Sequence, residues 1–280
     1  MLRSIKLALL LLPLMLLPRI GEAQLILDLA DIVGGGDGTG TGGFQQGIET
    51  STGLPTTFVE NINNAPVNTF VTSINPFVDG LVIPDGGPGR TASIPISSTG
   101  LVVTGVTDMT PLVSPGTITP TTLSVWNGTF CTVFCTVGLP GIQIQSFANH
   151  GITFDLDAIE AFHSDEAIAF SVSAVNGQPG ALGSPLQLGS HYVFVDGQLE
   201  AEVDTRLGTN VVTFPPILLE PSDRFLTLMT SANGTINGDF EIWLDPVLLL
   251  PEPGFGAGLV CCTGLLQIIG SRRVFATTDM

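Results

Sequence analysis

The sequence has very few basic residues. Only eight of its 280 residues are Lys or Arg, and between Gln24 and Pro253 three arginines stand against 23 Asp and Glu, a net charge of −20. A polyanion repels phosphate backbones, which excludes nucleic acid as a partner. Such charge favours solubility outside the cell, and carboxylates can hold divalent cations, so calcium is the one cofactor we keep as a candidate.

Recognisable catalytic patterns are also missing. The three histidines, His150, His163 and His191, are accompanied by neither a Gly-x-Ser-x-Gly elbow nor a His-Glu-x-x-His helix. We expect His150 to be a turn residue and His191 a strand residue. In so acidic a chain a glycosidase pair of carboxylates cannot be chosen from spacing. We therefore expect a protein that is not an enzyme.

Both ends of the chain carry apolar segments with basic neighbours. Residues 1–23 have a basic start, an apolar run from Leu7 to Leu17 and small residues before Gln24, which predicts a cleaved signal peptide. An uncleaved anchor is the alternative, but the run is short of the ~20 residues that span a bilayer. At the other end, Arg272 and Arg273 follow an apolar stretch, as in a segment held in a membrane.

Residues 24–67 show few signs of regular structure. The apolar stretch LILDLADIV is followed by GGGDGTGTGGFQQG, residues 34–47. A phosphate-binding loop would have to follow a strand and open a helix, and the residues after this run lack a helical period. We therefore predict a Gly/Thr-rich leader or flexible linker.

Residues 68–250 read as short strands separated by turns. In AIAFSVSAV the apolar Ile168, Phe170, Val172 and Ala174 alternate with other residues, as period two requires, and Asp196-Gly197 is a strong hairpin signal. The fold class predicted is all-β: an antiparallel β-sandwich of the jelly-roll type with one short helix.

That helix is predicted at DAIEAF, residues 157–162. Asp157 would cap its first turn and Glu160 would lie near its positive end. The alternative is that Asp155, Asp157, Glu160 and His163 bind a metal; solvated capping explains the four residues more simply.

Cys131 and Cys135 are the only cysteines before the apolar tail, and their spacing suits a small disulfide loop in an oxidising compartment. A metal site would need further ligands, and no nearby His or Cys completes a set. Two free thiols are the remaining alternative.

Three segments resemble a known family. FANHGITFDLDAIEA, HYVFVDGQL and LEPSDRFLTLMTSANGTINGDFEIWLDPVLL are similar to the NPCBM family of carbohydrate-binding modules. The matching positions are Ala148 to Leu156, Phe194 to Gly197, Ser222 to Leu228, and Asp245-Pro246. The resemblance implies a galactose-binding-like jelly roll over residues 68–250, with carbohydrate or exopolysaccharide as the partner.

The tail, residues 251–280, resembles a PEP-CTERM sorting signal: Pro251-Glu252-Pro253, an apolar segment and the arginine pair. Gln267 interrupts the apolar run, a departure from the usual form. The resemblance implies processing by an exosortase-type enzyme, a transient inner-membrane anchor with a short transmembrane segment, and a final place at the cell surface or outside the cell.

Sugar rings stack on aromatic faces, and aromatic residues beside polar loop residues are the natural binding candidates. The aromatic residues Tyr192 and Trp243 are candidates for stacking on a sugar ring. Trp243, however, alternates with apolar residues in a strand and suits a core role equally well. Both candidate loops could instead be ordinary Asn-Gly turns. The loops VWNGTF and SANGTINGDF supply the predicted carbohydrate-binding residues: Trp126, Asn127, Asn233, Asn237 and Asp239.

The function predicted is an exported, surface-associated, non-catalytic carbohydrate-binding module. The alternative is a structural cell-surface or exopolysaccharide-matrix protein without a defined sugar ligand.

Overall fold

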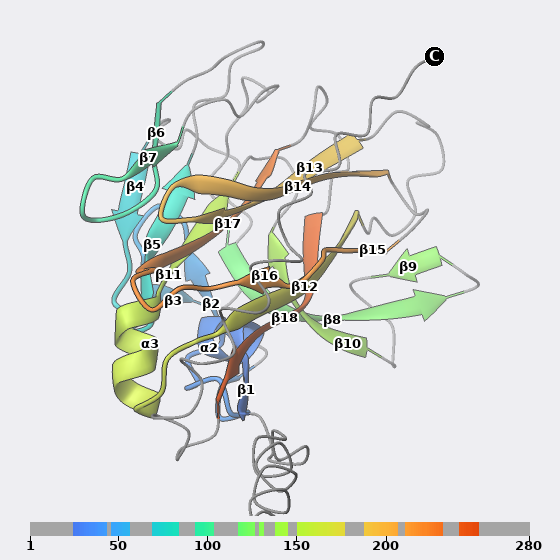
Figure 1. Cartoon of the computed structure of the whole chain (residues 1–280). Helices are drawn as coiled ribbons and strands as arrows, with labels where there is room; N and C mark the ends of the chain where they lie inside the picture. Colours follow the sequence, from blue (N-terminus) through green and yellow to red (C-terminus); the bar gives the residue numbers. More distant parts are fainter. Residues whose placement is uncertain are drawn as a thin grey trace, which may run out of the picture. The chain divides into compact units, whose positions relative to one another are not determined.

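Antiparallel strands make up most of the structure, a computed structural model, and only two short helices occur among its described residues (Figure 1). The all-β fold class predicted from the sequence is confirmed, with one helix more than expected. The described residues are 25–43, 46–56, 69–83, 93–103, 117–126, 129–131, 138–144, 150–176, 188–206, 211–231 and 241–251.

The larger sheet, sheet A, has a main path in the order β15-β12-β18-β10-β8-β2-β3, with β1 beside β18, β16 beside β12 and β9 beside β8. Its strands are β1 (Leu25–Asp28), β2 (Gly47–Glu49), β3 (Pro55–Thr56), β8 (Thr117–Trp126), β9 (Thr129–Cys131), β10 (Gly138–Ile144), β12 (Ala169–Asn176), β15 (Val212–Thr213), β16 (Ile217–Leu218) and β18 (Glu241–Leu250).

Sheet B has the order β14-β13-β17-β11-β5-β4. From β11 onward the chain passes repeatedly between the two sheets, the connection pattern of a sandwich. The strands of sheet B are β4 (Thr69–Thr72), β5 (Val78–Ile83), β11 (Gly151–Asp155), β13 (Leu188–Val195), β14 (Gln198–Arg206) and β17 (Phe225–Ser231); a separate hairpin pairs β6 (Ile94–Pro95) with β7 (Val102–Val103).

A histidine and a tryptophan meet between the sheets. His191 of β13 and Trp243 of β18 are both fully buried, and their rings form an edge-to-face pair with centroids 4.7 Å apart. His191 also makes a hydrogen bond to the backbone of Ile242, which joins sheet B to sheet A. The predicted strand position of His191 is confirmed, and Trp243 has a core role that removes it from the binding candidates.

The predicted alternation in β12 is also confirmed, since Phe170, Val172 and Ala174 are buried. Ile168 lies just before the strand and is half-buried. Between Phe170 and Ala174, every second residue of β12 therefore enters the core, as the sequence pattern predicted.

The outer face of sheet B is covered by the β6–β7 hairpin. Ile94, Ile96 and Val103 of the hairpin form a buried cluster with residues of β5, β13 and β17, including Tyr192. Tyr192 is 2% exposed, so this residue, which we considered for sugar stacking, is a packing residue. The Phe70 ring lies so close to Gly80 of β5 that a Cβ there would collide with it.

Within the range 24–67, which we expected to be a leader or linker, the structure places the described residues 25–43 and 46–56 in the sandwich. Residues 26–250 form one compact unit, in which β1 and β2 are strands of sheet A. The apolar stretch that we left unassigned forms a second helix, α2 (Leu29–Val33), capped by Asp28, whose Oδ1 accepts from Ala30 N at 2.8 Å. The side chains of Leu27, Ile32 and Ile48 are buried.

The glycine-rich run follows α2 and is folded around a carboxylate. Asp31 is 7% exposed and accepts hydrogen bonds from Gly42 N through Oδ1 and from Gly38 N through Oδ2, at 2.6 and 2.8 Å. A Cβ at Gly36 would collide with the Asp31 carboxylate, which explains a glycine at that position. Because the loop follows a helix instead of opening one, it does not have the arrangement of a phosphate-binding loop.

The predicted signal peptide, residues 1–23, and the predicted sorting tail, residues 251–280 apart from Pro251, fall outside the described residues, so both stay predictions. Neither helix in the described part of the chain has the length and apolar character needed to span a bilayer.

We expect Ile32→Ala to lower the free energy of unfolding by about 2–5 kcal/mol, because it deletes fully buried apolar atoms from α2. Ile26→Ala is the matched control from the same segment: Ile26 is 56% exposed, and its loss should change stability by no more than about 0.5 kcal/mol. Urea denaturation followed by circular dichroism measures both. If both variants changed the free energy of unfolding equally little, the segment would be a linker and not part of the core.

The buried His191 should make the protein sensitive to acid. Loss of solvation lowers the pKa of His191 from 6.5 to about 3, so between these values the unfolded chain binds a proton that the folded chain does not. The free energy of unfolding should then fall as the pH falls, by at most about 1.4 kcal/mol per pH unit. Urea titrations between these two pH values should show a shallower slope for His191→Gln. Ile32→Ala, which changes stability without removing a titratable group, is the control and should keep the wild-type slope.

Candidate functional site

The strand that leads into one predicted binding loop, β8, and the strand that follows the other, β18, reach opposite ends of β10. Ser124, near the end of β8, pairs with Gly138 at the start of β10, whereas Glu241, at the start of β18, pairs with Ile144 at the end of β10. The two strand ends are therefore about 20 Å apart along β10. We predicted one binding site made by both loops. The positions of these strand ends do not favour a single shared site. The side chains of Trp126, Asn127, Asn233, Asn237 and Asp239 lie outside the described residues, so their binding roles stay predictions.

The predicted disulfide between Cys131 and Cys135 also stays a prediction. Cys131 ends β9, where it pairs with Ser124, but its side chain and the whole of Cys135 lie outside the described residues.

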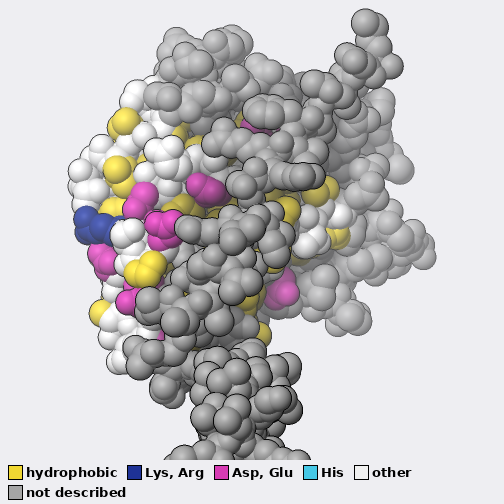
Figure 2. Space-filling view, viewed as in Figure 1, with side chains coloured by type: hydrophobic (Ala, Val, Ile, Leu, Met, Phe, Trp, Pro, Cys, Tyr) yellow, Lys and Arg dark blue, Asp and Glu magenta, His cyan; other side chains and the backbone are white. Residues whose placement is uncertain are grey.

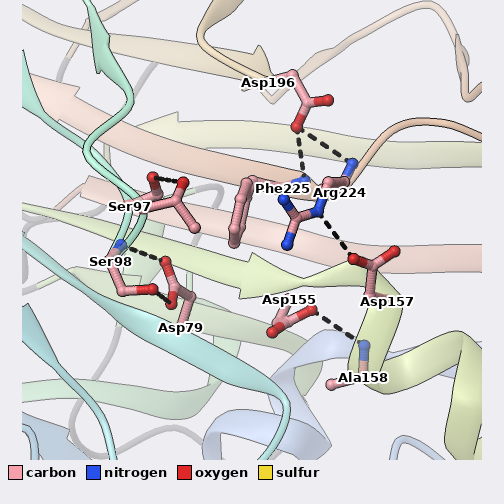
Figure 3. Close-up of polar contacts among 10 residues, drawn as sticks. Asp79, Ser97, Ser98, Asp155, Asp157, Ala158, Asp196, Arg224 and Phe225 are labelled. Atoms are coloured by element: carbon pink, nitrogen blue, oxygen red, sulfur yellow. Dashed lines mark hydrogen bonds and ion pairs between the residues drawn. The ribbon is translucent and has the colours of Figure 1, made fainter.

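The structure brings together a different set of polar residues, at one end of sheet B. We call Asp79, Asp155, Asp157, Asp196 and Arg224 the strand-end cluster (Figure 3). They come from β5, the end of β11, the first turn of α3 (Leu156–His163), the β13–β14 turn and the residue before β17. Segments more than a hundred residues apart in the sequence thus meet at this end.

Asp196 ties the β13–β14 turn to the start of β17. Its Oδ1 accepts from Arg224 N at 3.1 Å and from Phe225 N at 2.9 Å, while its own N donates to Phe225 O. Asp196 and Gly197 both have positive φ, of 47° and 80°, as a tight hairpin turn requires. The predicted hairpin is confirmed, and its aspartate has a second role that the turn signal did not reveal.

Helix α3 begins one residue earlier than predicted, and a different aspartate caps it. Asp155 Oδ1 accepts from Ala158 N at 3.0 Å, so Asp155, instead of Asp157, is the N-cap. Burial raises the pKa of the Asp155 carboxyl, although the Ala158 N–H acts in the opposite direction. Leu156 N donates to Arg224 O, which joins the helix start to β17.

The other members of the predicted helix group are also engaged. Glu160 accepts from Ala167 N at 2.8 Å, beyond the helix end, and His163 Nε2 lies 2.9 Å from the carbonyl oxygen of Asp37. Within the described residues, no three His, Cys, Asp or Glu side chains are grouped to hold a metal ion. The geometry favours capping over the metal alternative for this group.

Asp79 anchors the hairpin that covers sheet B. Its two carboxylate oxygens accept from Ser98 N at 2.7 Å and from the Ser98 hydroxyl, so the β6–β7 connection is tied to β5. Most carboxylates of the strand-end cluster are thus committed to backbone or hydroxyl donors of the fold.

Arg224 and Asp157 form the solvent-facing part of the cluster. Arg224 Nε donates to Asp157 Oδ2 at 2.9 Å, and their side chains are 53% and 57% exposed. The hydrogen bond and charge of Asp157 raise the pKa of Arg224, and the guanidinium carbon lies 5.2 Å from the centre of the Phe225 ring. Figure 2 shows one dark blue Lys or Arg side chain on this face with magenta Asp and Glu side chains beside it. The N–H groups of Arg224 can donate hydrogen bonds to hydroxyl groups of a ligand, and the carboxylate of Asp157 can accept hydrogen bonds from them.

The remaining histidine is buried. His150 directly precedes β11 and is 1% exposed, and its carbonyl oxygen accepts from Thr230 N. It lies outside a strand and is not assigned to a turn, and the sequence did not indicate its burial at the sheet end.

Part of the strand-end cluster comes from the motifs that carry the family resemblance. The segment GITFDL supplies Asp155, FVDG supplies Asp196, and SDRFLTL supplies Arg224 and Phe225. The sequence therefore contained a signal for this site, but nothing in it indicated that the three segments are bonded to one another.

We expect Asp196→Ala to lower the free energy of unfolding by about 1–3 kcal/mol, because two backbone N–H groups lose their acceptor. Asp196→Asn keeps an acceptor oxygen and tolerates positive φ, so it should cost less. Asp157→Ala removes only a solvent-facing ion pair and should cost less than Asp196→Ala. Urea denaturation compares the three variants. A loss for Asp157→Ala equal to that for Asp196→Ala would contradict this ranking.

No known family model matches this chain, and no curated protein matches it significantly. Among solved structures, it is similar to CBM51 from the Clostridium perfringens GH95 in complex with methyl-galactose, at 16% identity and a TM-score of 0.35, over 59% of this chain and 90% of that one. It is also similar to CBM51-2 in complex with GlcNAc and INT domains from ZmpB of the same organism, at 15% identity and a TM-score of 0.36. That match covers 62% of this chain and 30% of the ZmpB chain.

Proposed function

We propose that this protein is a non-catalytic carbohydrate-binding module of the NPCBM type. The observation that carries the proposal is the strand-end cluster: three segments, separated in sequence and each resembling an NPCBM motif, are joined by hydrogen bonds at one end of sheet B. Such linkage is expected if the three motifs are parts of one inherited module. It would be a coincidence if each resemblance had arisen independently.

The proposal includes export. A signal peptide at residues 1–23 would send the chain out of the cytoplasm, and the PEP-CTERM-like tail, residues 251–280, would hold it in the inner membrane until an exosortase-type enzyme acts. The net charge of −20 between Gln24 and Pro253 suits a soluble domain at the cell surface or outside the cell.

Ligand binding is assigned to the loops after β8 and before β18. Trp126 offers an aromatic face, Asn127 an amide, and Asn233, Asn237 and Asp239 supply oxygens that accept hydrogen bonds from sugar hydroxyls or hold a calcium ion. Because β8, before one loop, and β18, after the other, reach opposite ends of β10, we treat the loops as two separate candidate subsites.

The proposal is tested by a glycan array with the purified full-length protein, followed by titration of any sugar that binds. We expect Trp126→Ala or Asp239→Ala to weaken binding of that sugar about tenfold or more, which is ~1.4 kcal/mol, with little change in the melting temperature. Glu200→Gln, at an exposed position of β14 near the Asp196-Gly197 turn and at the opposite end of sheet B from Ser231, serves as the control.

If the protein binds no glycan on the array, the alternative of a structural matrix protein without a defined sugar ligand takes its place. If a glycan binds but both loop variants keep wild-type affinity, the function stands and the assigned loops are wrong.

A further inference from the structure

A large aromatic ring is exposed on the last turn of α3. Phe162 is 59% exposed, although its helix buries Leu156 and Ile159. Its ring meets Phe77 edge to face, with centroids 5.2 Å apart and planes at 71°, and meets the ring of His163 at 5.0 Å and 79°. Two T-shaped ring contacts hold the ring in place, while Phe162 remains 59% exposed. The ring is therefore positioned before any ligand arrives.

A polar turn contacts His163, the residue next to Phe162. His163 contacts Phe162 on one side, and its Nε2 lies 2.9 Å from the carbonyl oxygen of Asp37 in the glycine-rich loop. Both helices, with the loop that follows α2, lie toward the lower end of the domain in Figure 1. Contacts between residues 126 positions apart in the sequence thus create one surface from two segments.

The turn itself is rich in hydroxyl groups. Asp37 Oδ1 accepts from Thr39 N at 2.9 Å, from Thr39 Oγ1 at 2.6 Å and from Thr41 Oγ1 at 3.0 Å. All three bonds end on Oδ1, so Oδ2 is the oxygen that can accept from a ligand hydroxyl. The hydroxyl and amide of Thr39 lower the pKa of Asp37 to about 2, which keeps the carboxylate ionised in neutral and mildly acidic solution.

We propose that Phe162 and the Asp37–Thr41 turn form a further carbohydrate subsite, which binds a neutral pyranose by one apolar ring face. The C–H face of the sugar would lie on the Phe162 ring, and ring hydroxyls would donate to Asp37 and exchange hydrogen bonds with Thr39 and Thr41. The inference rests on the proposed carbohydrate-binding function and adds a subsite that uses neither the β8–β9 nor the β17–β18 loop.

Charge and size select this class of ligand. The region from Gln24 to Pro253 carries a net charge of −20, so a sugar with carboxylate or sulfate groups would be repelled, whereas a neutral sugar would not. A single exposed aromatic ring is small beside the ~800 Å² that each partner buries in a stable protein interface, but it matches the area of one sugar ring. Because the ring and turn are already ordered, binding loses little conformational entropy.

The test uses NMR titration of the ¹⁵N-labelled full-length protein with methyl β-glucopyranoside and methyl β-galactopyranoside. Sorbitol, which offers hydroxyls without a ring face, is the control ligand. We expect at least one glycoside, and not sorbitol, to shift the amide signals of residues 37–41 and 160–164. Phe162→Ala should weaken binding of that glycoside about tenfold or more, Phe162→Trp should retain it, and Asp37→Asn should weaken it about threefold.

Leu218→Ala is the matched control, since Leu218 is an exposed apolar residue on β16 with a side chain 75% exposed. It should leave the titration unchanged. Melting temperatures show whether each variant is folded, and retention of binding by Phe162→Trp separates a stacking role from a structural one.

The proposal is overturned if glycosides leave the signals of residues 37–41 and 160–164 unchanged, or if Phe162→Ala binds as well as the wild type. If the same protein still binds a glycan on the array, and Trp126→Ala or Asp239→Ala weakens that binding, the proposed function survives without this subsite. If no glycan binds on the array or in the titration, both proposals fail together.

Discussion

The fold depends on hydrogen bonds from backbone N–H groups to carboxylates, because the chain is acidic and has few cationic side chains to pair with them. Lysine is absent between Gln24 and Pro253, so ion pairs can serve few of the acidic side chains, and backbone N–H groups take their place. Asp28 and Asp155 each begin a helix, Asp31 closes the glycine-rich loop, and Asp196 holds the start of β17. A buried or half-buried carboxylate is costly without such donors, and backbone N–H groups at strand and helix ends need acceptors. Each pairing therefore serves both needs, and it fixes where one element ends and the next begins.

This use of carboxylates also limits where a ligand can bind. Asp79, Asp155 and Asp196 are committed to the fold, so they are poorly placed to exchange their partners for sugar hydroxyls. Asp157, Arg224 and Phe162 are exposed. The strand-end cluster is thus mainly structural, and the carbohydrate recognition that we propose falls to side chains other than these three carboxylates.

The apolar contacts between the sheets work together with these polar ends. His191 and Trp243, both fully buried, join sheet B to sheet A through a ring contact and a hydrogen bond to the backbone of Ile242. A neutral imidazole is compatible with that burial and a charged one is not, which links the stability of the sandwich to pH. The polar ends orient the strands, and the packed interior holds the sheets together.

The sequence by itself determined the all-β class, the alternation in β12 and the Asp196-Gly197 turn, because these follow from side-chain periodicity and from the backbone conformations that single residues prefer. Only the tertiary structure decided that residues 25–43 and 46–56 belong to the sandwich, that Asp155 instead of Asp157 caps α3, and that β8 and β18, which adjoin the two predicted binding loops, reach opposite ends of β10. The reason is the range of the interactions. Asp31 reaches amides up to 11 residues away, Asn75 Nδ2 donates to Ile32 O across 43 residues, and His163 meets Asp37 across 126. Local patterns record what one stretch of chain prefers, whereas contacts over such distances exist only once the sheets have brought the stretches together.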